Sequence, residues 1–115
     1  MILPALILGA VIVGTSLVAI FWNKVVETLQ KVINKIKVAM NRTVLGCTIK
    51  LKRLGDRFQN RQSHFSKDEQ GNWQEQIVTY EQNAEEIPDK YKEGNYATMD
   101  DEFDISDDLE LQLKH

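Results

Sequence analysis

The run MILPALILGAVIVGTSLVAIFW, residues Met1–Trp22, contains no charged side chain. Its ~20 apolar residues match the hydrocarbon core of a bilayer at about 1.5 Å of helix rise per residue. Phe21 and Trp22 close the run as an interfacial aromatic pair. A cleaved signal peptide is one alternative, but a basic start and a small-residue cleavage site are both missing. A buried helix of a soluble protein is the other, and the length of the run disfavours it. The run therefore predicts a transmembrane helix over residues 1–22.

Basic residues follow this run, and none precedes it. They are Lys24, Lys31, Lys35, Lys37 and Arg42. Because basic flanks stay on the cytoplasmic side, we expect a single-pass membrane protein with its N-terminus outside and its C-terminal body in the cytoplasm. The single cysteine, Cys47, agrees with a reducing compartment. Four residues are expected to contact lipid headgroups, namely Trp22, Lys24, Lys31 and Lys35.

From Trp22 to Met40 the apolar residues recur at alternating spacings of four and three, as in a helical seam. We therefore expect a basic amphipathic juxtamembrane helix over residues 23–41. Small residues at the same spacing in the first run allow close helix packing in lipid. The positions assigned to helix packing are Ala5, Gly9, Ile12, Ser16, Ala19, Val26, Leu29, Ile33, Ile36 and Met40. The seam fits self-association equally with packing on the membrane or on the chain's own downstream domain.

After Asn41 the period of the apolar residues changes from helical to two. Leu45, Cys47, Ile49 and Leu51 alternate with polar or small residues, which is typical of a half-buried strand. Residues 57–66 and 73–81 are further extended stretches bounded by turn-forming residues. We expect an antiparallel three-stranded β meander over residues 42–82, completed by the helix or by another subunit. The fold class expected is thus an α+β membrane protein.

The two parts of the chain carry opposite charge. Residues 1–67 hold eleven Lys and Arg against two acidic residues, whereas residues 68–115 hold three Lys against fifteen Asp and Glu. We expect residues 83–115 to form an acidic, largely irregular tail that docks on a partner, folds back on the basic half, or only solubilises the chain. The tail residues assigned to partner binding are Asp100, Asp101, Phe103, Asp104, Ile105, Leu109 and Leu111.

No residue pattern indicates catalysis, a cofactor or a bound metal. His64 and His115 have no ligand at metal spacing, and Cys47 alternates with apolar residues as a small core side chain. The sequence contains no glycine-rich phosphate loop, nucleophile elbow or zinc motif. We therefore expect no enzyme, and we assign no catalytic, metal or cofactor residue.

Arginines and aromatic residues are scattered over the expected strands, as in some nucleic-acid surfaces. They are Arg53, Arg57, Phe58, Arg61, Phe65 and Trp73. They form no motif, and the acidic half would repel a phosphate backbone, so nucleic acid is not an expected partner. The partners expected are membrane lipid, further copies of the chain, and another membrane or cytoplasmic protein.

Two functions fit these features. The first is a membrane-anchored adaptor or regulatory subunit that self-associates or joins a larger membrane complex and presents its cytoplasmic domain and tail to a partner protein. The second is an oligomeric membrane effector that forms a pore or permeabilises the membrane. A pore usually needs a polar stripe, and only Thr15 and Ser16 supply one here. The sequence therefore favours the adaptor.

Overall fold

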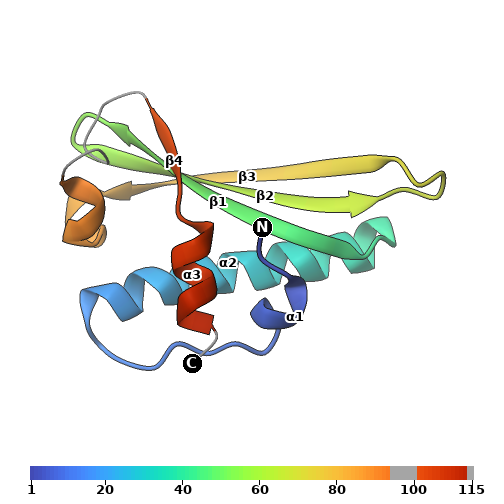
Figure 1. Cartoon of the computed structure of the whole chain (residues 1–115), viewed down its shortest axis with the longest axis horizontal. Coiled ribbons are helices and arrows are strands. Elements are labelled where there is room, and N and C mark those ends of the chain that lie inside the picture. Colours follow the sequence, from blue (N-terminus) through green and yellow to red (C-terminus); the bar gives the residue numbers. More distant parts are fainter. Residues whose placement is uncertain (94–100, 114–115) are drawn as a thin grey trace.

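The centre of the fold is an antiparallel sheet with the strand order β3-β2-β1-β4 (Figure 1). The computed structural model describes residues 1–93 and 101–113. The strands are β1 (Val44–Leu54), β2 (Arg57–Lys67), β3 (Trp73–Asn83) and β4 (Glu102–Asp104). Gly55 supplies the positive φ of the β1–β2 turn and Gly71 that of the β2–β3 loop. The first three strands lie where the period of two places the expected meander, and β4 adds a fourth from the C-terminal region.

One long helix, α2 (Leu17–Met40), packs across one face of this sheet (Figure 1). The Ser16 hydroxyl caps it by accepting a hydrogen bond from the Ala19 N–H at 3.2 Å, and Asn41 ends it in the left-handed conformation. Its buried stripe is the apolar seam with its neighbours, namely Ala19, Phe21, Trp22, Val25, Val26, Leu29, Ile33 and Ile36. The seam therefore packs on the chain's own sheet, which is one of the two arrangements that the sequence left open.

The prediction of a transmembrane helix over residues 1–22 is wrong. In the part of the chain that the structure describes, no helix is both long enough and apolar enough to cross a bilayer. The uncharged run is divided instead among an extended start, a one-turn helix α1 (Pro4–Ile7), a loop, and the beginning of α2. Gly9 and Gly14 have φ of 81° and 136°, values that reverse the chain and break a helix.

Three further expectations fail with that helix. The single-pass topology, with the N-terminus outside and the body in the cytoplasm, has no membrane span to support it. The membrane-anchored adaptor and the pore-forming effector lose their anchor for the same reason. Among the expected headgroup residues, Trp22 is buried in the core, where its ring meets that of Phe21 at 4.9 Å between centroids. The observed class is an α+β domain with a 24-residue helix on a four-stranded sheet.

The C-terminal region is ordered against the sheet where it is described. After two 3₁₀ turns, η1 (Ala84–Glu86) and η2 (Asp89–Lys92), the chain returns as β4 and the helix α3 (Ser106–Leu113). Ile105 and Leu109 are fully buried in the main core. The Tyr91 hydroxyl donates a 2.6 Å hydrogen bond to the Asp108 carboxylate, which ties η2 to α3. The expected irregular tail thus contributes a strand, a helix and core residues to the fold.

Candidate functional site

The most reactive residue types of the chain meet inside the domain, where β1 pairs with β2. Cys47 and His64 are register partners, and their Sγ and Nδ1 atoms lie 3.4 Å apart. Both side chains are fully buried. Burial raises the pKa of the Cys47 thiol to about 12 and lowers the pKa of the His64 imidazole to about 4. Both groups are neutral at pH 7, so the pair holds no thiolate nucleophile.

His64 belongs to a row of polar side chains on β2, which we call the polar row: Asn60, Gln62 and His64. They are every second residue of β2, on the side of the sheet that α2 covers, and all three are fully buried. Gln62 Nε2 donates to the Val25 carbonyl at 3.4 Å, but Gln62 Oε1, His64 Nε2 and both polar atoms of Asn60 have no hydrogen-bond partner in the described structure. Each such atom costs roughly 1–3 kcal/mol. The polar row therefore places buried polar atoms between α2 and the sheet.

The described residues do not form a metal site. Within 1–93 and 101–113, no three His, Cys, Asp or Glu side chains converge as a set of ligands. The amides beside His64 are poor ligands for the metals that imidazole and thiol prefer. In the described residues, the buried side chains around Cys47 and His64 therefore present a neutral thiol and a neutral imidazole but no cluster of metal ligands.

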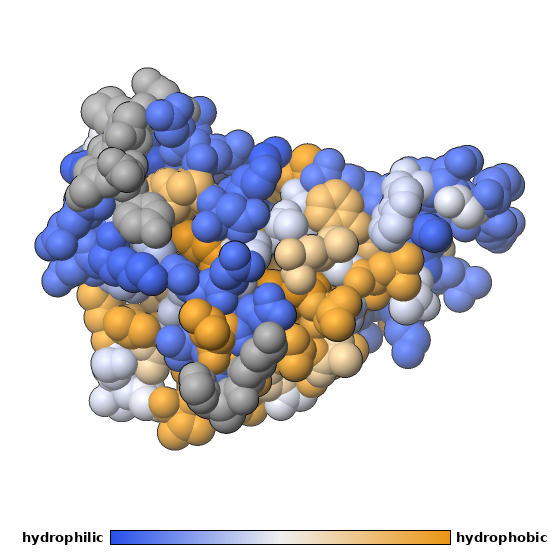
Figure 2. Space-filling model, in the orientation of Figure 1, coloured by the Kyte–Doolittle hydropathy of each residue, from blue (hydrophilic) through white to orange (hydrophobic). Residues whose placement is uncertain are grey.

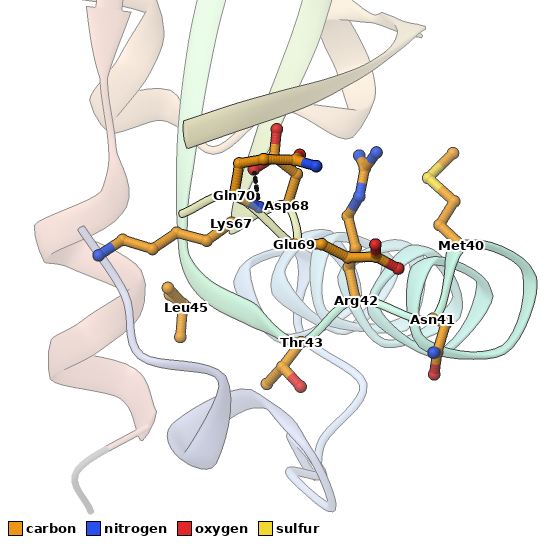
Figure 3. A pocket seen from close by; sticks show the side chains of 9 residues that line it. All are labelled: Met40, Asn41, Arg42, Thr43, Leu45, Lys67, Asp68, Glu69 and Gln70. Carbon is orange, nitrogen blue, oxygen red and sulfur yellow. Dashed lines mark hydrogen bonds between the residues drawn. The ribbon is translucent and has the colours of Figure 1, made fainter. Parts of the chain in front are cut away.

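An open cleft of about 480 Å³ lies between the C-terminal end of α2 and the β2–β3 loop (Figure 3). The loop is held by Asp68, whose carboxylate accepts 2.9 Å hydrogen bonds from the backbone N–H groups of Asn72 and Gln70. Those bonds hold the pKa of the Asp68 carboxyl below its usual value, and the bond from Asn72 has the largest effect. Arg42 extends beside the loop from the α2 side (Figure 3). The cleft has mixed charge and wide access to solvent, so it has no features of an enclosed ligand site.

Exposed apolar side chains gather on the N-terminal segment and the first turn of α2. We call this surface the N-terminal face: Leu3, Leu8, Val11, Val13, Leu17, Val18 and Ile20. Val11 is 76% exposed and Val13 is 88% exposed. Hydrophobic residues gather along the lower part of the molecule, below the sheet, in Figure 2. Exposed apolar side chains that gather in one region can mark interaction sites in folded proteins.

Hydrogen bonds hold the N-terminal face in place. Gln30 Nε2 on α2 donates to the carbonyls of Ile7 and Ala10 at 2.8 and 3.1 Å. The Ile12 N–H donates to Asn23 Oδ1 at 3.4 Å. Between this loop and α2 runs an open groove of about 470 Å³, with Gln30, Lys31 and Asn34 on its polar side. The apolar side chains therefore point outward from a loop whose backbone is already tied to the helix.

The sheet face opposite α2 carries a second, smaller apolar patch. Met1, Thr48, Phe65 and Trp73 line a shallow hollow there. Trp73 is 57% exposed, and Lys67 Nζ lies 4.9 Å from the centre of its ring. A Cβ at Gly46 would meet the end of the exposed Met1 side chain, which would have to move aside.

The residues assigned to helix packing separate into two groups. Ala5 lies in α1, and Gly9, Ile12 and Ser16 lie in or end the loop before α2. Ala19, Val26, Leu29, Ile33 and Ile36 face the sheet from α2, whereas Met40 is partly exposed at its end. Lys24, Lys31 and Lys35 lie on the exposed side of α2.

The residues assigned to partner binding lie mostly against the chain's own sheet. Phe103 and Asp104 are in β4, Ile105 and Leu109 are buried, and Leu111 is exposed on α3. Asp101 is exposed just before β4, and Asp100 lies outside the described residues.

The scattered arginines and aromatics are divided between the two faces of the sheet. Phe58 is in the core, with Arg53 5.9 Å from its ring. Arg61 pairs with Glu102 at 2.8 Å, and Arg57 pairs with Glu81 at 3.6 Å. Phe58 and Arg53 therefore lie on the α2 side of the sheet, whereas Arg57, Arg61, Phe65 and Trp73 lie on the opposite side.

No protein-family model, curated protein or solved structure matches this chain. Sequence reasoning missed the N-terminal face because it assigned the same residues to lipid. The signals that distinguish the two were Gly14, Thr15 and Ser16, a glycine followed by helix-capping residue types in the middle of the apolar run.

Proposed function

We propose that this chain is a non-enzymatic protein-interaction domain, and that its N-terminal face binds an acidic amphipathic helix of another protein. The observation that carries the proposal is the exposure of the N-terminal face on a loop already fixed to α2. A preformed apolar surface loses little conformational entropy when a partner covers it. Helices that lay an apolar stripe into a groove are a recurrent mode of recognition.

The charges beside the N-terminal face select the partner. The exposed side of α2 carries Lys24, Lys31 and Lys35 against one acidic residue, Glu27. Lys31 lines the groove beside the loop. A helix with carboxylates along the edges of its apolar stripe therefore complements this surface, and a helix with lysines there is repelled.

The neutral Cys47–His64 pair supports the non-enzymatic part of the proposal. Its atoms are buried, and the two pKa shifts favour the thiol and the uncharged imidazole. A catalytic cysteine needs the opposite environment, with access to solvent and a stabilised thiolate.

The test is binding of a fluorescently labelled synthetic helix with a leucine stripe flanked by glutamates, followed by fluorescence anisotropy. We expect saturable binding that weakens with salt, and at least about tenfold weaker binding by the double variant Val11→Asp/Val13→Asp. Gln59→Glu/Gln70→Glu is the matched control, because it also adds two negative charges, on β2 and in the β2–β3 loop, away from the N-terminal face, and it should leave binding unchanged. A helix of the same length with lysines in place of glutamates should not bind. Equal binding of the two helices, or of the double variant and the wild type, would contradict the proposal.

A further inference from the structure

The outer edge of β3 is bare in the described part of the chain. β3 is the terminal strand of the sheet, and its other edge pairs with β2 without a bulge over all eleven of its residues. Figure 1 shows β3 running along the outer side of the sheet. The strand contains no proline, and its only charged residues are Glu75 and Glu81. Such an edge is a template for another strand.

The hydrogen-bond register shows which β3 residues face outward. Asp68 N–H donates to the Asn72 carbonyl at 2.9 Å next to the first β2–β3 pair, Lys67 with Trp73. Since hydrogen-bonded and non-bonded pairs alternate along an antiparallel ladder, the odd-numbered residues of β3 turn their N–H and C=O groups away from β2. Ile77, Thr79 and Glu81 are among them, and Ile77 is 48% exposed.

We propose that two copies of this chain pair through the outer edges of β3, antiparallel and about a twofold axis at Ile77. The main-chain groups that face outward then bond to their counterparts, and the two four-stranded sheets become one continuous sheet. Ile77 lies opposite Ile77 of the second copy. The side chains of both copies that meet across the axis lie on the sheet face opposite α2, next to the patch of Phe65 and Trp73.

Charge selects this register over its neighbour. An axis at Val78 would set Glu75 opposite Glu81 of the second copy twice, and like charges directly opposite destabilise a strand pair. The axis at Ile77 sets Glu75 opposite Thr79 and Trp73 opposite Glu81. Lys67 Nζ lies 4.9 Å from the Trp73 ring, so it supplies a positive charge near that second carboxylate. The proposal is independent of the N-terminal face, which lies across the sheet.

The first experiment is the solution mass of the full chain over a range of concentrations, by sedimentation or light scattering. We expect the wild type to approach twice its 13.2 kDa as concentration rises. Ile77→Lys places two lysines opposite each other on the axis and should stay monomeric. Thr79→Lys is the matched control, because its lysine meets Glu75 of the second copy and the dimer should persist. Unchanged urea unfolding of both variants shows that they remain folded.

A second experiment reads the register directly. Ile77→Cys should form an intermolecular disulfide on mild oxidation, because paired Cα atoms of an antiparallel ladder lie about 5.5 Å apart. Glu81→Cys should not, because its counterpart is Trp73. The native Cys47 is buried in both variants and does not compete. A wild type that stays monomeric, an Ile77→Lys variant as dimeric as the wild type, or equal crosslinking at both cysteines would overturn the proposal.

Discussion

The two strands that flank β2 have the same length and lie in the same sheet, yet their outer sides differ. The outer side of β1 is covered by two pieces of chain: Ile2 bonds to Cys47, and the C-terminal segment pairs with residues 50–52 through β4 and bonds to Ile49 through Ile105. No described residue covers the outer side of β3. Both the uncharged N-terminal run and the acidic C-terminal region thus complete the β1 side of the sheet. The difference teaches that strongly apolar or strongly acidic segments at the ends of a chain can pair with the edge of its central sheet.

Removal of a fully buried apolar side chain from the C-terminal segment that covers β1 should have the largest effect. Leu109 is fully buried in the core, and Leu109→Ala should lower the free energy of unfolding by roughly 2–5 kcal/mol through lost burial and the cavity left behind. Urea unfolding measures the change. Leu111→Ala on the same helix, where the side chain is exposed, should change stability by less than about 0.5 kcal/mol. Equal losses at the two positions would show that α3 does not pack as described.

The pH dependence of stability tests the burial of His64 between α2 and the sheet. The pKa of His64 falls from 6.5 to about 4 on folding because the imidazole is buried. A depressed pKa means that the unfolded chain binds the proton more readily. The contribution of the neutral His64 to the free energy of unfolding is therefore fully present above pH 6.5. It is lost as pH falls toward 4, by at most about 3 kcal/mol.

Urea unfolding at a series of pH values measures this slope. His64→Gln removes the titrating group. The free energy of unfolding of this variant should therefore fall less between pH 7 and pH 4 than that of the wild type. An equally steep loss in the variant would assign the effect to other groups. The Cys47 thiol acts at the other end of the scale, because its pKa is raised to about 12 and its contribution is lost as pH rises above 9.

A smaller effect is expected from one polar contact of the β1 cover. The Ser106 hydroxyl accepts a 2.9 Å hydrogen bond from the Ile49 N–H, a buried contact. Ser106→Ala leaves that N–H without its acceptor and should cost about 1–3 kcal/mol in urea unfolding. Thr79→Ala on the exposed β3 edge is the matched control, and the monomer's stability should stay within about 0.5 kcal/mol of the wild type. A neutral Ser106→Ala would show that the contact is not made in solution.

The smallest effect concerns the ion pair that joins β4 to β2. Arg61 and Glu102 lie 2.8 Å apart, and about a third of each side chain is exposed. Glu102→Gln should therefore lower stability by only about 0.2–1 kcal/mol, and the difference should shrink as salt is added. A loss that is independent of salt would mean that the pair acts through packing and not through charge.

The sequence located the central elements well, because each has a clear period. Alternation from Leu45 to Leu51 placed β1, and the seam from Trp22 to Ile36 matches the buried stripe of α2. What the period did not show was what the seam packs against. A helix stripe of this width suits a sheet, another helix and a membrane surface alike, and only the structure identified the sheet.

The two ends of the chain could not be placed from composition. An uncharged apolar run has the same average hydropathy whether it forms one helix or is divided by Gly9 and Gly14, whose positive φ angles break it here. In the acidic region, Ile105 and Leu109 were too few to indicate a core on their own. They become core residues because β4 and the N–H of Ile105 fix them against β1 through long-range pairing.

Amide hydrogen exchange tests the contrast between the two strands most directly. In dilute solution, the N–H groups of Cys47 and Ile49, which donate to Ile2 and Ser106, should exchange slowly, and those of Ile77 and Thr79 should exchange freely. At high concentration Ile77 and Thr79 should become protected as well. Rapid exchange at Cys47 and Ile49 would contradict the account, because the ends of the chain would then leave β1 as open as β3.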